Sequence, residues 1–126
     1  MKTERPVNLS LSPAKFSWPV TAMASILHRA TGMALFVGVG FLLYVLDMAL
    51  ASDAGFANAS ALLDQPLPKL ALLAVLAELT YHLFAGVKHL LLDAHIGDSF
   101  EAASRAAWLV FVLSALAVVA LGAWLW

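Results

Sequence analysis

The stretch MALFVGVGFLLYVL, residues 33–46, is an apolar run without a charged side chain. Two more apolar segments follow it, residues 70–92 and 106–126, and the last carries no charge at all. A helix needs about 20 such residues to cross a hydrocarbon layer of about 30 Å. Of the 126 residues, 63% are hydrophobic and 12% are charged, against about 45–50% and about 25% in soluble domains. The sequence therefore predicts an all-α membrane protein with three transmembrane helices.

The expected spans cover about residues 20–50, 69–92 and 106–126, within a single transmembrane domain, residues 1–126. Pro19 suits the first turn of a helix, where its missing N–H group costs nothing. Residues 51–68 are rich in glycine, asparagine, serine and proline and are expected to form a connecting loop. Residues 93–105 form a shorter polar connection.

Basic residues set the expected orientation. Of the seven lysines and arginines, only Lys69 flanks the first connection, and the other six lie before the first span, in its first turns or beside the second connection. Because basic residues in short loops stay on the cytoplasmic side, we expect a cytoplasmic N-terminus and a periplasmic C-terminus. The first apolar segment is too long and begins too late for a signal peptide, and residues 1–15 form no basic amphipathic helix typical of a transit peptide. The expected location is a bacterial inner membrane.

Cysteine is absent, which excludes thiolate-held iron–sulfur clusters, Cys zinc sites and disulfides within this chain. No phosphate-binding glycine loop, metalloprotease motif or nucleophile elbow occurs. The net charge of -1 does not indicate a nucleic-acid partner.

His82 is predicted near the middle of the second span, where an unpaired polar group is costly. Neutral imidazole is the commonest metal ligand, and in a helical bundle haem iron is a frequent partner. Gly86, one turn away on the same face, would let a flat macrocycle approach the backbone. The alternative is a histidine hydrogen-bonded across helices, with Gly86 serving close packing.

Further polar residues are expected at the cytoplasmic edge. His89 lies two turns from His82, and with Lys88 it could meet haem propionates or form a solvated basic helix end. Ser25, His28 and Arg29 share one helix face. The arginine could hold a propionate or polarise a quinone carbonyl, with the serine donating a second hydrogen bond; snorkelling to lipid phosphates is the alternative.

Other polar residues have no assigned role. Glu78, one turn before His82, could pair with another subunit or accept protons. Asp93 ends its helix where its charge is unfavourable to the helix dipole, which indicates an unidentified partner. The glycines of the first and third spans are expected to serve close helix contact.

Three runs together resemble a known family: RPVNL at 5–9, SILHRATG at 25–32 and HLFAGVKHLLLD at 82–93. They resemble the b-type cytochrome membrane-anchor subunit of succinate dehydrogenase, respiratory complex II. The specific feature is Ser-x-x-His-Arg-x-x-Gly followed one span later by His-x-x-x-Gly-x-basic-His-x-x-x-Asp. The likeness covers nearly the whole chain.

The resemblance implies that His82 is one axial ligand of a single haem b, with the other supplied by a second membrane-anchor subunit in a shared helical bundle. It implies that Ser25 and Arg29 line the ubiquinone pocket beside the iron–sulfur subunit. It also implies that His28 and Arg29 approach the haem propionates. Lys88 stands where the family often has arginine, and His95 has no counterpart.

The expected function is to anchor a succinate dehydrogenase and pass electrons from iron–sulfur centres to ubiquinone. Without cysteines or a nucleotide loop the chain cannot oxidise succinate itself, so flavoprotein and iron–sulfur subunits are expected partners. One alternative is the anchor of a menaquinone-linked fumarate reductase. Another is a haem-free structural or proton-relay subunit that uses His82 and Glu78.

Overall fold

The computed structural model describes residues 18–126, and the sequence features of residues 1–17 lie outside it. Its helices are α1 (Val20–Ala51), α2 (Asp53–Asp64), α3 (Pro66–Asp93) and α4 (Phe100–Leu125). No strand occurs within this part of the chain. The helices α1, α3 and α4 are each long and apolar enough to cross a membrane. The expected all-α membrane architecture with three spans is confirmed.

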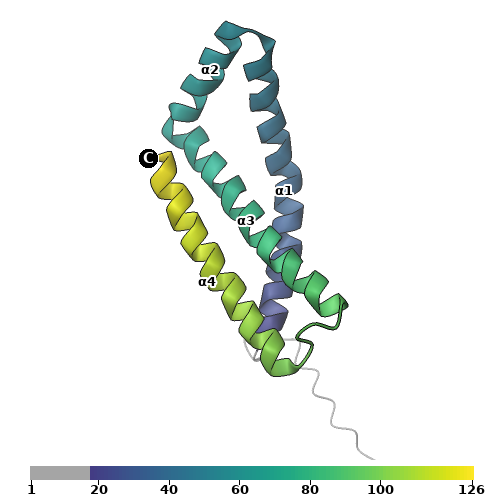
Figure 1. Ribbon diagram of the computed structural model, residues 1–126. Helices are drawn as coiled ribbons and strands as arrows, with labels where there is room; N and C mark the ends of the chain where they lie inside the picture. Colours follow the sequence, from purple (N-terminus) through teal and green to yellow (C-terminus); the bar gives the residue numbers. More distant parts are fainter. Residues whose placement is uncertain (1–17) are drawn as a thin grey trace, which may run out of the picture.

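The helices form an open bundle rather than a set of parallel rods. Figure 1 shows α1 running the length of the molecule, α2 turning back from its far end, and α3 continuing from α2 to cross α1. The antiparallel α4 then follows α3 and brings the C-terminus back toward the start of α3. There the Lys69 ammonium lies 5.7 Å from the centre of the Trp126 ring and 3.5 Å from an Asp64 carboxylate oxygen.

The predicted loop at 51–68 is wrong, because most of it forms α2. Ser52 caps this helix: its side-chain oxygen accepts a hydrogen bond from the Gly55 N–H at 3.0 Å. Asp53 in the first turn also stabilises α2, because its negative charge lies at the positive end of the helix dipole. The prolines that suggested a loop lie in the first turn of α3, with Pro66 at its start, where proline is tolerated.

Two further boundaries differ from the expected spans. Helix α3 begins at Pro66 instead of near residue 69, and α4 begins at Phe100 instead of Ala106. Ser99 explains the early start of α4, because its hydroxyl accepts a hydrogen bond from the Ala102 N–H at 3.3 Å. A serine followed by an acidic residue in the first turn is a helix-start signal.

Gly55 permits the sharp reversal between α1 and α2. A Cβ atom at this position would overlap the backbone carbonyl oxygen of Met48 in α1. Because backbone cannot move aside as a flexible side chain can, this close approach requires glycine. The fold-back of α2 on the end of α1 therefore depends on a residue that the sequence had suggested as part of a loop.

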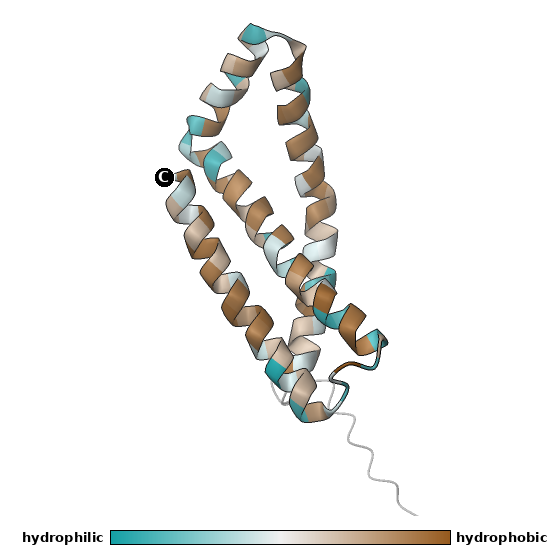
Figure 2. Cartoon of the chain, viewed as in Figure 1, coloured by the Kyte–Doolittle hydropathy of each residue, from teal (hydrophilic) through white to brown (hydrophobic). Residues whose placement is uncertain are grey.

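Contacts between the long helices use small residues, while large apolar side chains point outward. Ala24, Ala85 and Ala107 are fully buried, whereas Phe36 is 86% exposed. Figure 2 shows that hydrophobic residues predominate along the three long helices, and many of their large apolar side chains are exposed. Lipid and companion helices can cover such a surface, but water cannot do so favourably. The chain is a multi-pass membrane protein.

Gly38 lies where α1 meets α3. A Cβ atom there would be 2.9 Å from Val75 Cγ2, while one at Gly40 would meet nothing within 4 Å. We expect Gly38→Ala to destabilise the fold by about 1–3 kcal/mol, because the stiff valine cannot easily make room. Gly40→Ala is the matched control and should be neutral or slightly stabilising. Thermal unfolding of the detergent-solubilised protein checks this, and equal midpoints for the two variants would contradict it.

Candidate functional site

Three histidines from two helices meet where α1 crosses α3. The rings of His28 and His82 are stacked, with centroids 4.1 Å apart and planes 17° apart. The His89 ring lies 5.0 Å from the ring of His28 and is tilted by 50°. The structure thus brings together three of the residues singled out in the sequence, and His28 stands at the centre of the group.

Two glycines make room for this cluster. A Cβ atom on Gly32 would lie 3.0 Å from His82 Cε1, and one on Gly86 would lie 3.4 Å from His28 Nε2. The surface at Gly86 therefore faces the His28 imidazole. Close packing at Gly32 agrees with the expected role of the glycines, although its contact with His82 was not foreseen.

The hydrogen bonds of His82 define which of its ring nitrogens is free. Its Nδ1 atom lies 3.1 Å from the backbone carbonyl oxygen of His28 and 3.3 Å from the Thr31 hydroxyl oxygen. A carbonyl oxygen can only accept, so Nδ1 must carry the proton and donate it. In the neutral ring Nε2 then keeps its lone pair. This is the common arrangement of a metal-ligating histidine, whose second nitrogen donates to a carbonyl or similar acceptor.

The depth of His82 agrees with the expectation for a mid-span residue. It stands 16 residues after the start of α3 at Pro66 and 11 before its end at Asp93. At 1.5 Å per residue, these separations are about 24 Å and about 17 Å. Both ends of the helix are therefore remote enough to keep the imidazole within the apolar layer.

Positive groups surround the histidine cluster. Lys88 is only 5% exposed, and within residues 18–126 no carboxylate lies at ion-pair distance from it. Both Lys88 and Arg29 interact electrostatically with His28 and His89, and Asp93 interacts with His89. Asp93 and His89 form no ion pair or hydrogen bond within the described residues, so their attraction acts at longer range. A buried cation without a counter-ion is costly, so this end of the cluster suits an anionic group.

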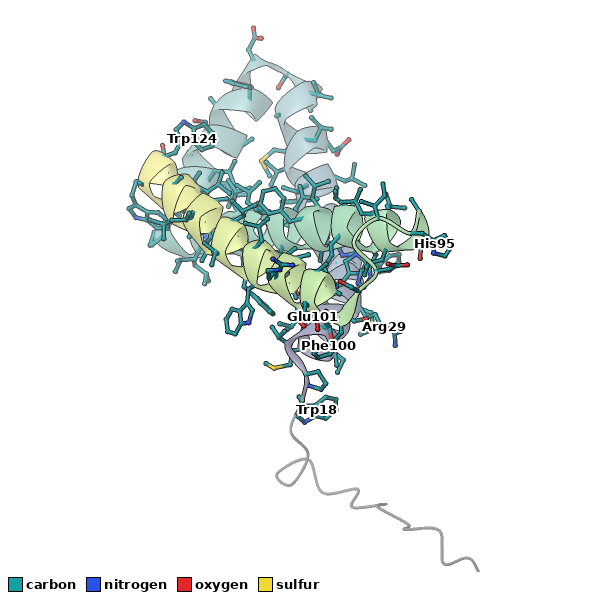
Figure 3. All side chains as sticks on the ribbon, turned by 60° about the horizontal axis from the view of Figure 1, so that its bottom comes forward. Trp18, Arg29, His95, Phe100, Glu101 and Trp124 are labelled. Atoms are coloured by element: carbon teal, nitrogen blue, oxygen red, sulfur yellow. The ribbon has the colours of Figure 1, made fainter. Side chains whose placement is uncertain are left out.

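Ser25 and Arg29 lie on α1 beside the histidine cluster, the former half-buried and the latter exposed. Figure 3 shows Arg29 at the same end of the bundle as Trp18 and Glu101, with Trp124 at the opposite end. On the same turns of α1, a hollow of about 370 Å³ is lined by Trp18, Met23, Ile26 and Leu27. Neither Ser25 nor Arg29 lines this hollow, and the helical repeat places Ser25 on the opposite side of α1 from Met23 and Leu27.

Sequence reasoning missed two polar residues that hold this region together. The Tyr81 hydroxyl donates a hydrogen bond to the Ala24 carbonyl at 2.9 Å, and its ring packs against Phe111 at 5.7 Å between centroids. This tyrosine therefore joins α3 to both α1 and α4. Thr31 was also missed as a partner of His82. A tyrosine in an apolar span needs a hydrogen-bond partner, which was the available signal for Tyr81.

The described residues contain no group of three or more histidine, cysteine, aspartate or glutamate side chains arranged to hold a metal ion. The donor chemistry nonetheless fits a haem iron bound through one imidazole, since His82 offers a single free nitrogen and positive groups lie nearby. Glu78 has no ion pair with any other residue of this part of the chain.

Three long apolar helices with a histidine near the middle of α3 define the protein as a helical membrane protein. The chain matches, over residues 1–121, the family described as succinate dehydrogenase/fumarate reductase transmembrane subunit.

Three relatives are each named succinate dehydrogenase cytochrome b556 subunit. That of Coxiella burnetii is 39% identical over 127 residues and covers 100% of both chains. That of Rickettsia felis is 35% identical over 115 residues, 90% of this chain and 86% of the relative. That of Paracoccus denitrificans is 35% identical over 100 residues, 78% and 77% of the two chains. The chain belongs to this family as a b-type cytochrome anchor subunit of succinate dehydrogenase.

Proposed function

We propose that the subunit supplies one axial ligand, His82, to a haem b that it shares with a second membrane-anchor subunit. The observation that carries this proposal is the hydrogen bond from His82 Nδ1 to the His28 carbonyl, which leaves Nε2 with its lone pair at mid-span. The b-type cytochrome in the names of the relatives supports haem as the group. Bound haem supplies reversible one-electron transfer.

The positive groups beside His82 account for the rest of the haem contact. His28, His89 and Arg29 bind the negatively charged propionates, and the buried Lys88 gains a counter-ion there. Gly86 allows the haem macrocycle to approach the backbone of α3 closely. In this structure the His28 imidazole lies on that side of Gly86.

Ser25 and Arg29 form this chain's part of a ubiquinone site. Their hydroxyl and guanidinium donors are suited to the carbonyl oxygens of a quinone. The whole chain, residues 1–126, acts as one transmembrane anchor domain in a bacterial inner membrane. The excess of basic residues supports a cytoplasmic N-terminus, on the side where the iron–sulfur and flavoprotein subunits dock and deliver electrons.

The first prediction concerns the ligand. His82→Ala should abolish the b-type absorption of the purified complex, because an alanine side chain cannot coordinate iron. A dithionite-reduced minus oxidised difference spectrum and a pyridine haemochrome assay measure the loss.

His95→Asn is the matched control for this substitution. His95 lies in the connection between α3 and α4 with a φ of 58°, which asparagine tolerates. Its haem content should equal that of the wild type. A wild-type complex without haem, or an unchanged spectrum in His82→Ala, would refute the ligand assignment.

The second prediction concerns the quinone site. Arg29→Ala should lower ubiquinone reductase activity about 100-fold or more, since one charge-assisted hydrogen bond contributes about 1.5–3 kcal/mol and the charge itself is also lost. Succinate oxidation by a soluble dye acceptor should remain near the wild-type rate, because that reaction does not use this site. Arg29→Lys should recover only part of the activity, because lysine lacks the planar fork of arginine.

Arg105→Ala is the control for general charge loss. Arg105 is also exposed, near the start of α4, and its substitution should leave both activities unchanged. Equal losses of quinone reductase and dye-linked activity in Arg29→Ala would indicate an assembly defect and exclude a specific quinone role.

A further inference from the structure

The His82 imidazole is held on the α1 side by three successive features of that helix. The His28 carbonyl lies 3.1 Å from Nδ1, the Thr31 hydroxyl lies 3.3 Å from Nδ1, and Gly32 lies against the ring edge. The carbonyl belongs to the backbone and is present whatever residue stands at 28. Thr31 and Gly32 are therefore the positions at which side chains adjust this contact.

The Thr31 hydroxyl is oriented to accept a hydrogen bond from the histidine. Its oxygen lies 2.9 Å from the Leu27 carbonyl and 3.0 Å from the His28 carbonyl. Because carbonyl oxygens only accept, the hydroxyl proton points to one of them, and an oxygen lone pair is left for His82 Nδ1–H. The Nδ1 proton is thus shared between two acceptors, the His28 carbonyl and the Thr31 oxygen.

We propose that Thr31 and Gly32 are positioning residues for the axial ligand: Thr31 sets the electron donation of His82, and Gly32 sets its place over α1. This inference rests on the proposed role of His82 as a haem ligand. Acceptors on the far nitrogen of a ligating histidine fix its orientation and raise its basicity. A more basic imidazole favours the oxidised, more positively charged iron, so the Thr31 contact lowers the haem midpoint potential.

Thr31→Val tests the hydroxyl at nearly constant shape. The variant keeps the branched side chain and removes the acceptor, so we expect a more positive haem midpoint potential and about tenfold weaker haem retention. Thr31→Ser restores the hydroxyl and should return both properties to wild-type values. Redox titration of the purified complex, followed at the haem absorption band, measures the potential independently of enzyme activity.

Gly32→Ala tests the steric part of the proposal. The added Cβ would lie 3.0 Å from His82 Cε1 and push the ring away, whereas the same change at Gly40 meets nothing within 4 Å. The low-temperature electron paramagnetic resonance spectrum of the oxidised haem reports the orientation of axial imidazoles. We expect it to change in Gly32→Ala and to match the wild type in Gly40→Ala.

The possible outcomes separate this inference from the proposed function. A Thr31→Val complex that retains haem at the wild-type potential overturns the role of Thr31, and an unchanged resonance spectrum in Gly32→Ala overturns that of Gly32. If Thr31→Val assembles without haem while Thr31→Ser holds it, positioning is supported. If Thr31→Val fails to assemble, the resonance spectra of Gly32→Ala and Gly40→Ala decide whether this face of α1 positions the His82 ring. Failure of the haem assignment itself would appear instead as an unchanged spectrum in His82→Ala.

Discussion

The hydrogen bond between His82 Nδ1 and the His28 carbonyl is the interaction on which the rest of the site depends. It satisfies a polar ring at a depth where an unpaired N–H group would be costly. It also joins the two helices that carry all the candidate ligands, because the acceptor is on α1 and the donor on α3. This contact thus settles the proton position on the ring, and together with the hydrogen bonds of Thr31 and Tyr81 it holds α1 packed against α3. The stacked His28 ring and the tilted His89 ring follow from that packing.

Close helix approach in this chain relies on small residues because lipid provides no hydrophobic force to press helices together. The wholly buried alanines, one on each of α1, α3 and α4, and the glycines at 32 and 38 serve this purpose. Polar bonds then add specificity, as in the tyrosine at 81, which reaches the backbone of α1. Because the neighbouring residues are small, the helices come close enough for the histidine and tyrosine side chains to make contacts between them.

Hydropathy alone was enough to predict the three spans, because an apolar run of sufficient length has few other stable states. It was not enough for α2, whose glycine, asparagine and serine suggested a loop, although the Ser52 cap and its following aspartate were signals for a helix. Helical spacing correctly grouped Ser25, His28 and Arg29 on one helix. It could not show that His28 would stack on His82 or that Thr31 would contact it, because those contacts depend on how α1 crosses α3. The place where two helices cross depends on how they pack together, so it cannot be read from the hydrophobic periodicity of either helix alone.

The outward direction of the large apolar side chains has a thermodynamic consequence. Among residues 18–126 no large side chain is completely buried, so the packing within this chain contributes little of the apolar contact that holds a folded state together. Most of that contact is available only to lipid, cofactor and neighbouring chains. By mass action, binding partners that prefer the folded form raise its apparent stability. The unfolding temperature of this subunit therefore depends on how much lipid, cofactor and partner protein is present and bound to it.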